Sequence, residues 1–330
     1  MQGQEASEQA FKQVAKPQSN VGIDVSKDWL DIHVLPEGGA LRVSNDAQGI
    51  GKLKRWLSRF AVALIAVEAT GKWHRALCRS LHASGLPVAV VDPFRVRMFA
   101  KAQGILAKTD RLDARVLAAF AAVMTPPVRP PAPEAMDDLK ELVAARDSLA
   151  AQQTALKNQL CAAQSAFLKR QLKTRIARGE KDIAALEREI LSRIEADDAL
   201  ARRHAILLSV PGFGPAVAAS LVANLAELGA CSAKQISLLA GLAPIADDSG
   251  KRQGVRVIWG GRAGVRRMLS LAALSAARFT ADMKAFYCRL IDDKKSAKLA
   301  LIAVARKLAI LANTLISQDR TWQQNAPKPA

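Results

Sequence analysis

The chain has few of the residues that build disulfide scaffolds, zinc sites or membrane spans. Cysteine occurs only 4 times in 330 residues, at distant positions with no CxxC pair and no Cys/His cluster. This spacing excludes a disulfide framework and a zinc site, and it fits a reducing compartment. No apolar run of about 18 residues is free of charge, and the chain up to Asn20 is polar. We therefore expect a cytoplasmic protein that neither inserts into nor crosses a membrane.

Acidic residues are scarce relative to basic ones. The 48 Lys and Arg residues outnumber the 30 Asp and Glu residues, which gives a formal net charge of +18. Because Lys and Arg that neutralise phosphates release condensed counterions, this excess predicts a polyanionic partner; the alternative is a merely soluble basic protein. Hydrophobic residues still make up 50% of the chain, which excludes a disordered polycation. The length predicts two or three folded units.

Short runs rich in Val and Ile dominate residues 21–125. They predict strands at residues 21–25, 29–35, 40–44, 62–67 and 88–91. Helical spacing of apolar residues predicts helices at residues 49–60, around 77–85 and within 94–124. Three successive strands followed by alternating helices and strands predict a mixed α/β sheet.

Proline is concentrated in one segment and missing from the next. Five prolines fall within residues 126–133, which predicts a semi-rigid linker. Residues 134–200 contain no proline and repeat apolar residues at helical spacing, so we predict a coiled-coil hairpin that reverses between Ser165 and Gly179. Its helices could serve as a protruding arm or an oligomer contact, or could pack within one helical domain. Residues 201–318 are predicted to form a mostly helical domain, which makes the whole chain α/β plus all-α.

Four carboxylates of the first region are candidate metal ligands. Asp24 lies in the middle of the first predicted strand, where a carboxylate is costly unless it is paired or binds a cation. Glu68 closes the fourth strand, and Asp110 and Asp113 are spaced to share one face of a helix. Oxygen ligands of this kind are those that Mg²⁺ or Mn²⁺ prefers. Two such ions could clamp the attacking and leaving oxygens of a phosphoryl transfer.

Each acid alone also allows a plainer interpretation. Asp110 and Asp113 could be a helix cap and a surface charge. Asp28 and Asp31 are interpreted as loop or solvent-face positions and are left out of the set. Only the combination of a strand Asp, a strand-end Glu and a helical Asp pair points to phosphoryl-transfer chemistry.

A glycine-containing turn lies between two predicted helices in residues 207–221. Gly212 and Gly214 would let the backbone approach a phosphate, and the helix that follows would present its N-terminal amides to it. This pattern predicts a helix–hairpin–helix-like contact with a nucleic-acid backbone. A plain helix–turn–helix corner is the alternative.

Most of the excess positive charge falls between residues 250 and 310, which hold 14 Lys and Arg residues and three acids. Aromatic residues are sparse there, so contact with the phosphate backbone is favoured over base stacking. The candidate nucleic-acid ligands of this segment are Lys251, Arg252, Arg256, Arg262, Arg266 and Arg267.

Ser249 lies in a loop of this basic region, directly before Gly250. A hydroxyl there could meet an incoming phosphate whose charge Arg252, Arg256 or Arg262 would stabilise. From the residues alone, a simple Asp-Ser-Gly turn is the favoured interpretation.

The segments around these residues resemble one known family. Gly22-Ile-Asp-Val-Ser-Lys27, Val67-Glu-Ala-Thr-Gly71 and Lys108-Thr-Asp-Arg-Leu-Asp-Ala-Arg115 are similar to motifs of the DEDD transposases of the insertion-sequence one-ten family. Residues 239–267 are similar to the block of that family that surrounds a catalytic serine. The resemblance extends over nearly the whole chain.

The resemblance implies both a fold and an activity. It implies a RuvC-like, ribonuclease-H-like domain over residues 21–125 that holds Mg²⁺ or Mn²⁺ on Asp24, Glu68, Asp110 and Asp113. It implies that Ser249, in a C-terminal transposase domain, attacks DNA to form a phosphoserine ester, from which strands are rejoined without ATP. The implied partners are donor DNA, target DNA and a bridge RNA. A dimer or tetramer in the bacterial cytoplasm, at the nucleoid, is also implied, with the serine of one subunit completing the metal site of another.

Two other functions remain open at this point. A metal-dependent, RuvC-like nuclease that resolves junctions with water as the nucleophile would need the four acids but not Ser249. A non-catalytic nucleic-acid-binding scaffold would need neither.

Overall fold

The computed structural model describes residues 18–105, 110–250 and 254–323, except for the side chains of residues 110 and 111. The chain forms two compact units that divide between Ala132 and Pro133. We call them the first and the second unit and describe each by itself.

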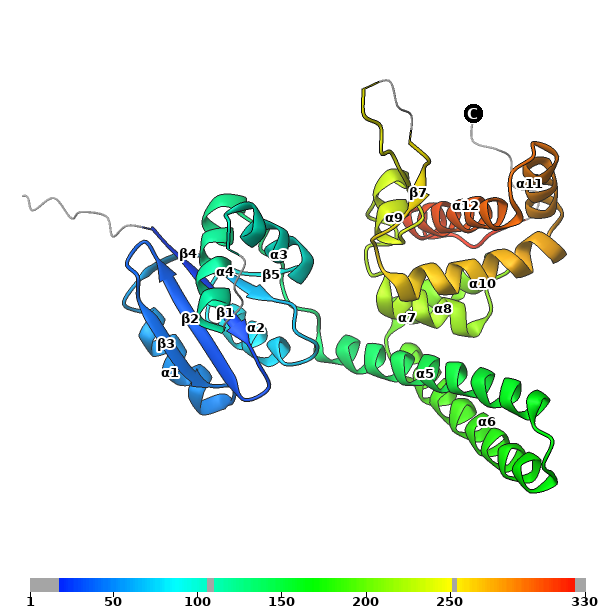
Figure 1. Ribbon diagram of the computed structural model, residues 1–330, viewed down its shortest axis with the longest axis horizontal. Coiled ribbons are helices and arrows are strands. Elements are labelled where there is room, and N and C mark those ends of the chain that lie inside the picture. Colours follow the sequence, from blue (N-terminus) through cyan, green and yellow to red (C-terminus); the bar gives the residue numbers. More distant parts are fainter. Residues whose placement is uncertain (1–17, 106–109, 251–253, 324–330) are drawn as a thin grey trace, which may run out of the picture. The chain divides into compact units, whose positions relative to one another are not determined.

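The first unit contains a five-stranded sheet in the order β3-β2-β1-β4-β5 (Figure 1). Its strands are β1 (Gln18–Val25), β2 (Trp29–Leu35), β3 (Ala40–Ser44), β4 (Ala61–Glu68) and β5 (Val88–Val91). The first three strands form an antiparallel meander, whereas β4 and β5 run parallel to β1. The mixed α/β sheet that the sequence predicted is therefore confirmed.

Helices cover both faces of this sheet (Figure 1). Apolar residues of α1 (Ala47–Leu57) and α2 (His74–Ala83) pack with Val21, Ile23 and Val25 of β1 on one face. Apolar residues of α3 (Pro93–Ala102) and α4 (Asp110–Met124) pack with alternate residues of β4 and β5 on the other. Because side chains of a strand alternate between faces, Gly22 and Asp24 belong to the face that α4 covers.

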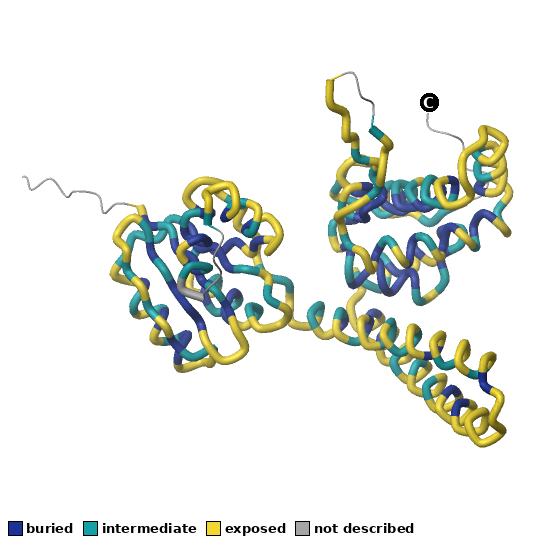
Figure 2. The backbone as a smooth tube through the Cα atoms, in the orientation of Figure 1, coloured by how far each residue is buried: buried dark blue, intermediate teal, exposed yellow. Residues whose placement is uncertain are grey.

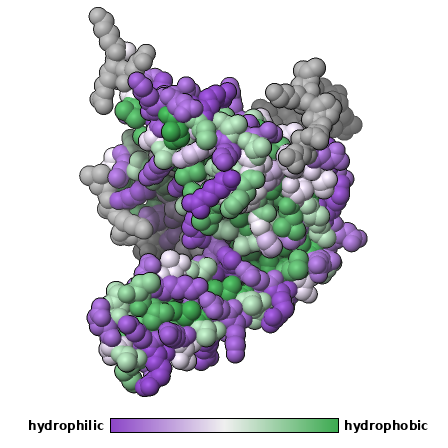
Figure 3. Space-filling view, turned by 90° about the vertical axis from the view of Figure 1, so that its right-hand side faces the viewer, coloured by the Kyte–Doolittle hydropathy of each residue, from purple (hydrophilic) through white to green (hydrophobic). Residues whose placement is uncertain are grey.

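The second unit begins with two long helices, α5 (Glu134–Ala162) and α6 (Ala166–Glu195). They lie side by side and antiparallel, as the ion pairs Arg146–Glu187 and Lys157–Glu180 show. Most of this hairpin is exposed (Figure 2). At the bottom of the view in Figure 3, hydrophobic residues gather in a patch bordered by hydrophilic ones. The chain reverses at residues 163–165, where Ser165 caps α6 by accepting a hydrogen bond from the amide of Leu168. The reversal therefore lies at the early edge of the interval expected from the sequence.

Gly179 lies inside α6 rather than at the turn, and a close approach explains why glycine stands there. A Cβ atom on Gly179 would overlap the side-chain amide of Gln153, which crosses from α5. Gln153 is buried, and its Nε2 donates to the carbonyl of Ile176 over 3.0 Å. The glycine is thus a notch for a buried amide between the two helices.

The helical body of the second unit follows the hairpin. Its helices are α7 (Asp198–Leu208), α8 (Pro215–Asn224), α9 (Ala233–Leu239), α10 (Ala263–Phe279), α11 (Ala281–Asp292) and α12 (Ala297–Ser317). The short strands β6 (Pro244–Ile245) and β7 (Val257–Ile258) form a two-stranded antiparallel hairpin. Apolar residues from α5 to α12 build one continuous core.

One helix of the described residues, α12, is long and apolar enough to cross a membrane by length and composition alone. It carries Arg306 and Lys307, and its Val304, Leu308 and Leu315 are fully buried in the core of the second unit. The position of α12 in this core accounts for its apolar composition.

Candidate active site

Asp24 and Glu68 are neighbours across the sheet. The register of the parallel strands β1 and β4 pairs Gly22 with Ala66 and Ile23 with Val67. The next residue of each strand is therefore Asp24 on β1 and Glu68 on β4. Ile23 and Val67 are fully buried on the opposite face, so both carboxylates belong to the face that α4 covers. Each of the two acids is only partly buried.

The helix α4 lies very close to this face. A Cβ atom on Gly22 would overlap the carbonyl oxygen of Ala114 and would come within 2.8 Å of the Cβ of Leu117. Ala114 and Leu117 are buried against the sheet. Asp113 directly precedes Ala114, so this contact fixes where the start of the helix, with Asp113, lies relative to β1.

The fourth predicted acid, Asp110, is the first residue of α4, and its side chain lies outside the described part of the structure. Within the described ranges, no three Asp, Glu, His or Cys side chains form a group that could hold a metal ion. The strands thus bring Asp24 and Glu68 together, and α4 brings the backbone of Asp113 to the same face. The donor chemistry fits a hard cation, because carboxylate oxygens are the ligands that Mg²⁺ prefers.

Asp31 belongs to the same row of residues, and the solvent-face interpretation of it was wrong. It is directly opposite Asp24 in the antiparallel register of β1 and β2, and only 6% of it is exposed. Arg42, opposite Asp31 on β3, donates from Nε over 2.8 Å and from Nη2 over 2.7 Å to the two carboxylate oxygens. The signal was the alternation of Leu30, Ile32 and Val34 with Asp31 and His33, which places Asp31 on the face of Asp24. Asp28, in contrast, is exposed as expected.

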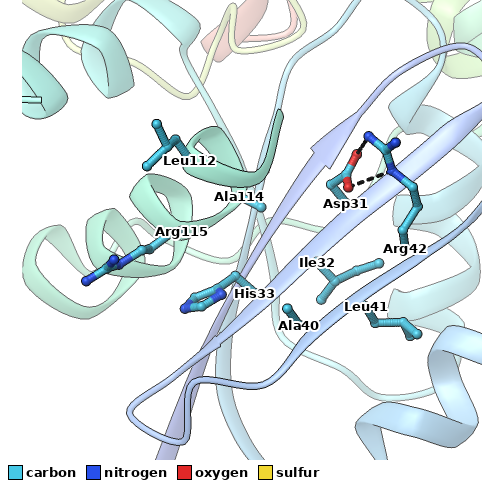
Figure 4. Close-up of a pocket in the computed structure, with 9 residues that line it drawn as sticks. All are labelled: Asp31, Ile32, His33, Ala40, Leu41, Arg42, Leu112, Ala114 and Arg115. Carbon is cyan, nitrogen blue, oxygen red and sulfur yellow. Dashed lines mark hydrogen bonds and ion pairs between the residues drawn. The ribbon is translucent and has the colours of Figure 1, made fainter. Parts of the chain in front are cut away.

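A cavity of about 460 Å³ lies between β2, β3 and the first turns of α4 (Figure 4). The Asp31–Arg42 ion pair lines it, with His33 and Arg115. Burial lowers the pKa of His33, and the positive charge of Arg115 lowers it further. His33 is therefore neutral near pH 7 and adds no charge to the cavity.

Ser249 lies in the exposed loop between β6 and β7, and Gly250 after it has a positive φ of 55°. Across this loop Arg256 donates from Nη1 and Nη2 to the two carboxylate oxygens of Asp248, over 2.8 Å each. The amide of Gly254 donates to the same carboxylate over 3.0 Å. Hydrogen bonds from Arg256 and Gly254 lower the pKa of Asp248, so the clamp stays charged at neutral pH. The loop thus exposes Ser249 to solvent, and the Asp248–Arg256 ion pair holds the two sides of the loop together.

Two further arginines hold the base of this loop. Arg262 donates to both carboxylate oxygens of Glu227 over 2.6 and 2.7 Å, and to the carbonyl of Asn224 over 2.8 Å. Arg266 donates to the carbonyl of Gly260 over 2.7 Å. These bonds tie the segment after β7 to the end of α8 and to the start of α10.

The predicted nucleic-acid ligands therefore differ in how they are engaged. Arg267 forms an ion pair of 2.6 Å with Asp147 of α5, and Arg256, Arg262 and Arg266 make the bonds just described. Lys251 and Arg252 lie outside the described residues. Contact between these side chains and nucleic acid stays a prediction.

The two glycines between α7 and α8 have different surroundings. Gly212 has a positive φ of 82°, and a Cβ there would come within 2.5 Å of the carbonyl of Ala272 and 2.9 Å of Ala276 in α10. Its lack of a side chain is thus explained by packing inside the unit. Gly214 caps α8 and faces open space, so it is the better placed of the two to meet a phosphate.

Comparison with known proteins identifies relatives of both units. Residues 21–167 match a family model described as transposase, the DEDD type of the insertion sequence IS110. Residues 204–288 match a second model, described as the transposase IS116/IS110/IS902 family.

Curated relatives align over nearly their whole length. The pilin gene-inverting proteins of Moraxella bovis and Moraxella lacunata are each 26% identical over 317 residues, which is 92% of this chain and 97% of theirs. The transposase for insertion sequence element IS1111A of Coxiella burnetii is 22% identical over 352 residues, which is 93% of this chain and 92% of the relative. With both family models matched in order along its length, this chain belongs to the IS110 family of DNA transposases and recombinases.

Proposed function

We propose that this protein cuts and rejoins DNA through a metal-binding acid site in the first unit and a serine nucleophile in the second. The observation that carries the proposal is the register of β1 and β4, which makes Asp24 and Glu68 neighbours on the face that α4 covers. The carboxylate oxygens of these two neighbouring residues are of the kind that Mg²⁺ or Mn²⁺ prefers as ligands.

In this proposal Asp24, Glu68, Asp110 and Asp113 hold Mg²⁺ or Mn²⁺. The bound ions would supply positive charge to the oxygens of the reacting phosphodiester. The chain itself contributes the placement of its acids, since the contact of Gly22 with α4 holds Asp113 near the row of Asp24 and Glu68.

The Oγ of Ser249 is the proposed nucleophile. Its attack on the phosphorus forms a Ser–O–P bond and breaks the bond from phosphorus to the displaced sugar oxygen. The serine hydroxyl gives up its proton, and the displaced sugar oxygen takes up a proton to become a hydroxyl. Attack on the phosphoserine by a sugar hydroxyl of another strand then reverses these changes and restores serine, so the energy of the phosphodiester is conserved without ATP. The exposure of Ser249 and the Asp248–Arg256 brace across its loop support this role.

We further propose a structured guide RNA of the bridge type as a partner, with donor and target DNA, and assembly as a dimer or tetramer. The formal charge of +18 supports binding to nucleic acid, since neutralised phosphates release counterions. The exposed helical hairpin α5–α6 offers a surface for assembly. Sequencing the RNA that co-purifies with the full chain tests guidance: one discrete species with segments complementary to both DNA substrates supports it, and random cellular fragments contradict it.

A covalent-trapping experiment tests the chemistry. The full chain with its co-purifying RNA is incubated with supercoiled plasmid DNA carrying the sequences that flank the gene, with Mg²⁺ or Mn²⁺, and adducts are detected on a denaturing gel after nuclease digestion. We expect an adduct with the wild-type chain and none with Ser249→Ala. The control is Ser192→Ala, which changes an exposed serine of α6 and should leave the adduct unchanged.

Other outcomes would contradict parts of the proposal. DNA cleavage with no adduct in any variant would favour a metal-dependent nuclease that uses water. Full strand exchange by a chain carrying Asp24→Asn and Asp113→Asn would contradict a catalytic role of the acids. The first unit would then have only a scaffold role.

A further inference from the structure

The charged row of the first sheet extends beyond the predicted acids. Across β4, β1, β2 and β3, the residues in register are Glu68, Asp24, Asp31 and Arg42. All four are on the face that α4 covers, because the neighbours of each residue along its own strand pack on the other face. The row thus contains three carboxylates and ends on one guanidinium.

Asp31 is as close to Asp24 in register as Glu68 is. Directly opposite residues of an antiparallel pair have Cβ atoms about 4.5–5.5 Å apart, so an uncompensated Asp31 would repel Asp24 or act with it on a cation. Arg42 occupies both oxygens of Asp31 with a bidentate ion pair. The Asp31 side chain is 9% exposed, so its carboxylate is largely shielded from water.

The pair is not sealed inside a core. Asp31 and Arg42 line the cavity of about 460 Å³ beside the start of α4, and half of the Arg42 side chain is exposed. The stick view shows the two side chains joined at the rim of this cavity (Figure 4). A small cation could therefore reach the Asp31 carboxylate if Arg42 were absent.

We propose that Arg42 and Asp31 are a positioning pair that sets the cation affinity of the acid row. Arg42 takes up the carboxylate of Asp31, so that the cation binds at Asp24 and Glu68 and not between Asp24 and Asp31. The pair is neutral as a whole, and each partner alone changes the field at Asp24 in the opposite sense. This inference rests on the proposed metal site.

The pair can be tested by a double-mutant cycle on the full chain. Mn²⁺ binding is measured by titration calorimetry, or by the decrease in the electron paramagnetic resonance signal of free Mn²⁺. Arg42→Met should tighten Mn²⁺ binding on the order of tenfold, because a positive charge near the cation is lost. Asp31→Asn should weaken binding by a similar factor, because Arg42 then acts uncompensated. The double variant Asp31→Asn with Arg42→Met should return to the wild-type affinity.

Controls separate this role from a structural one and from the metal site itself. Lys54→Met removes one positive charge from α1, which packs on the opposite face of the sheet, and it should leave Mn²⁺ affinity unchanged. Asp24→Asn should abolish Mn²⁺ binding. If it does not, the proposed metal site is incorrect, whatever the effect of Arg42→Met. Equal or weaker binding by Arg42→Met would overturn the positioning role. If Arg42→Met does not fold, Asp31→Asn and the double variant still decide, because a purely structural pair predicts no gain of affinity from the second substitution.

Discussion

Gly22 of β1 lies directly against the backbone of Ala114 in α4, at a spacing that leaves no room for a side chain. This contact joins the strand that carries Asp24 to the helix that carries Asp113. The position of the helix therefore depends on the absence of one methyl group, and so does the geometry of the acid site.

Gly22→Ala tests this dependence. The methyl group should push α4 away from the sheet and lower the free energy of unfolding of the first unit by about 1–3 kcal/mol, as overpacking does. Strand exchange should fall by more than the loss of folded protein explains, because Asp113 moves with the helix. Urea unfolding and an exchange assay on the same samples measure the two effects.

The matched control is Gly51→Ala in α1, where a Cβ would meet no atom within 4 Å. That variant should be neutral, or more stable by about 0.5–1 kcal/mol, because alanine favours the helix. Equal behaviour of the two variants would contradict the close-packing argument.

The ion pair between Asp248 and Arg256, across the loop that carries Ser249, gives a second prediction. Arg256→Lys keeps the charge but cannot donate two parallel hydrogen bonds to Asp248, so the loop should lose its brace while the helical core stays intact. We expect a clear decrease in the yield of covalent adduct with no change in the melting temperature. Limited proteolysis should cut the loop faster in the variant; an unchanged cleavage rate together with normal adduct yield would show that the clamp is dispensable.

Stability should decline in mild acid because of His204. Burial lowers the pKa of His204 from 6.5, although a hydrogen bond to the carbonyl of Pro215 acts in the opposite direction. The folded chain then holds fewer protons than the unfolded chain, so the stabilisation is complete above pH 6.5 and is lost as the pH falls below it. The free energy of unfolding from urea melts at about pH 7.5 and about pH 5.5 should differ less for His204→Gln than for the wild-type chain. An identical difference would contradict the assignment.

The cysteines should react in an order that follows burial. Burial raises the pKa of the Cys78 thiol to about 11, whereas Cys161 and Cys288 are exposed. Because the thiolate is the reactive form, iodoacetamide should modify Cys161 and Cys288 first and reach Cys78 only after unfolding. Peptide mass spectrometry along a urea series measures this, and early labelling of Cys78 would indicate that α2 opens in the native state.

The sheet was predictable from sequence because its strands are short, rich in β-branched residues and separated by turn residues. The role of Asp31 was not, since a strand pattern gives the face of a residue but not what covers that face. Only the packing of α4 shows that a helix covers the side of the sheet carrying Asp24 and Asp31.

At two glycines, the residues nearby in sequence suggested a structural role that the fold does not bear out. Gly179 resembles a helix breaker, yet it admits a side chain from the neighbouring helix, while the true reversal at residues 163–165 contains neither glycine nor proline. Gly212 resembles part of a phosphate-binding turn, but its close neighbours are Ala272 and Ala276. In both cases the partner lies far away in the sequence, so no window along the chain could reveal it.

The notch at Gly179 has a consequence for the long hairpin. Leucine-rich helices can slide past each other by one repeat at little cost. Here a slip would break the hydrogen bond from Gln153 Nε2 to the carbonyl of Ile176 and would leave the space beside Gly179 empty. Only one alignment of α5 and α6 accommodates both residues. The contact of Gln153 with Gly179 therefore fixes how the two helices of the hairpin are aligned.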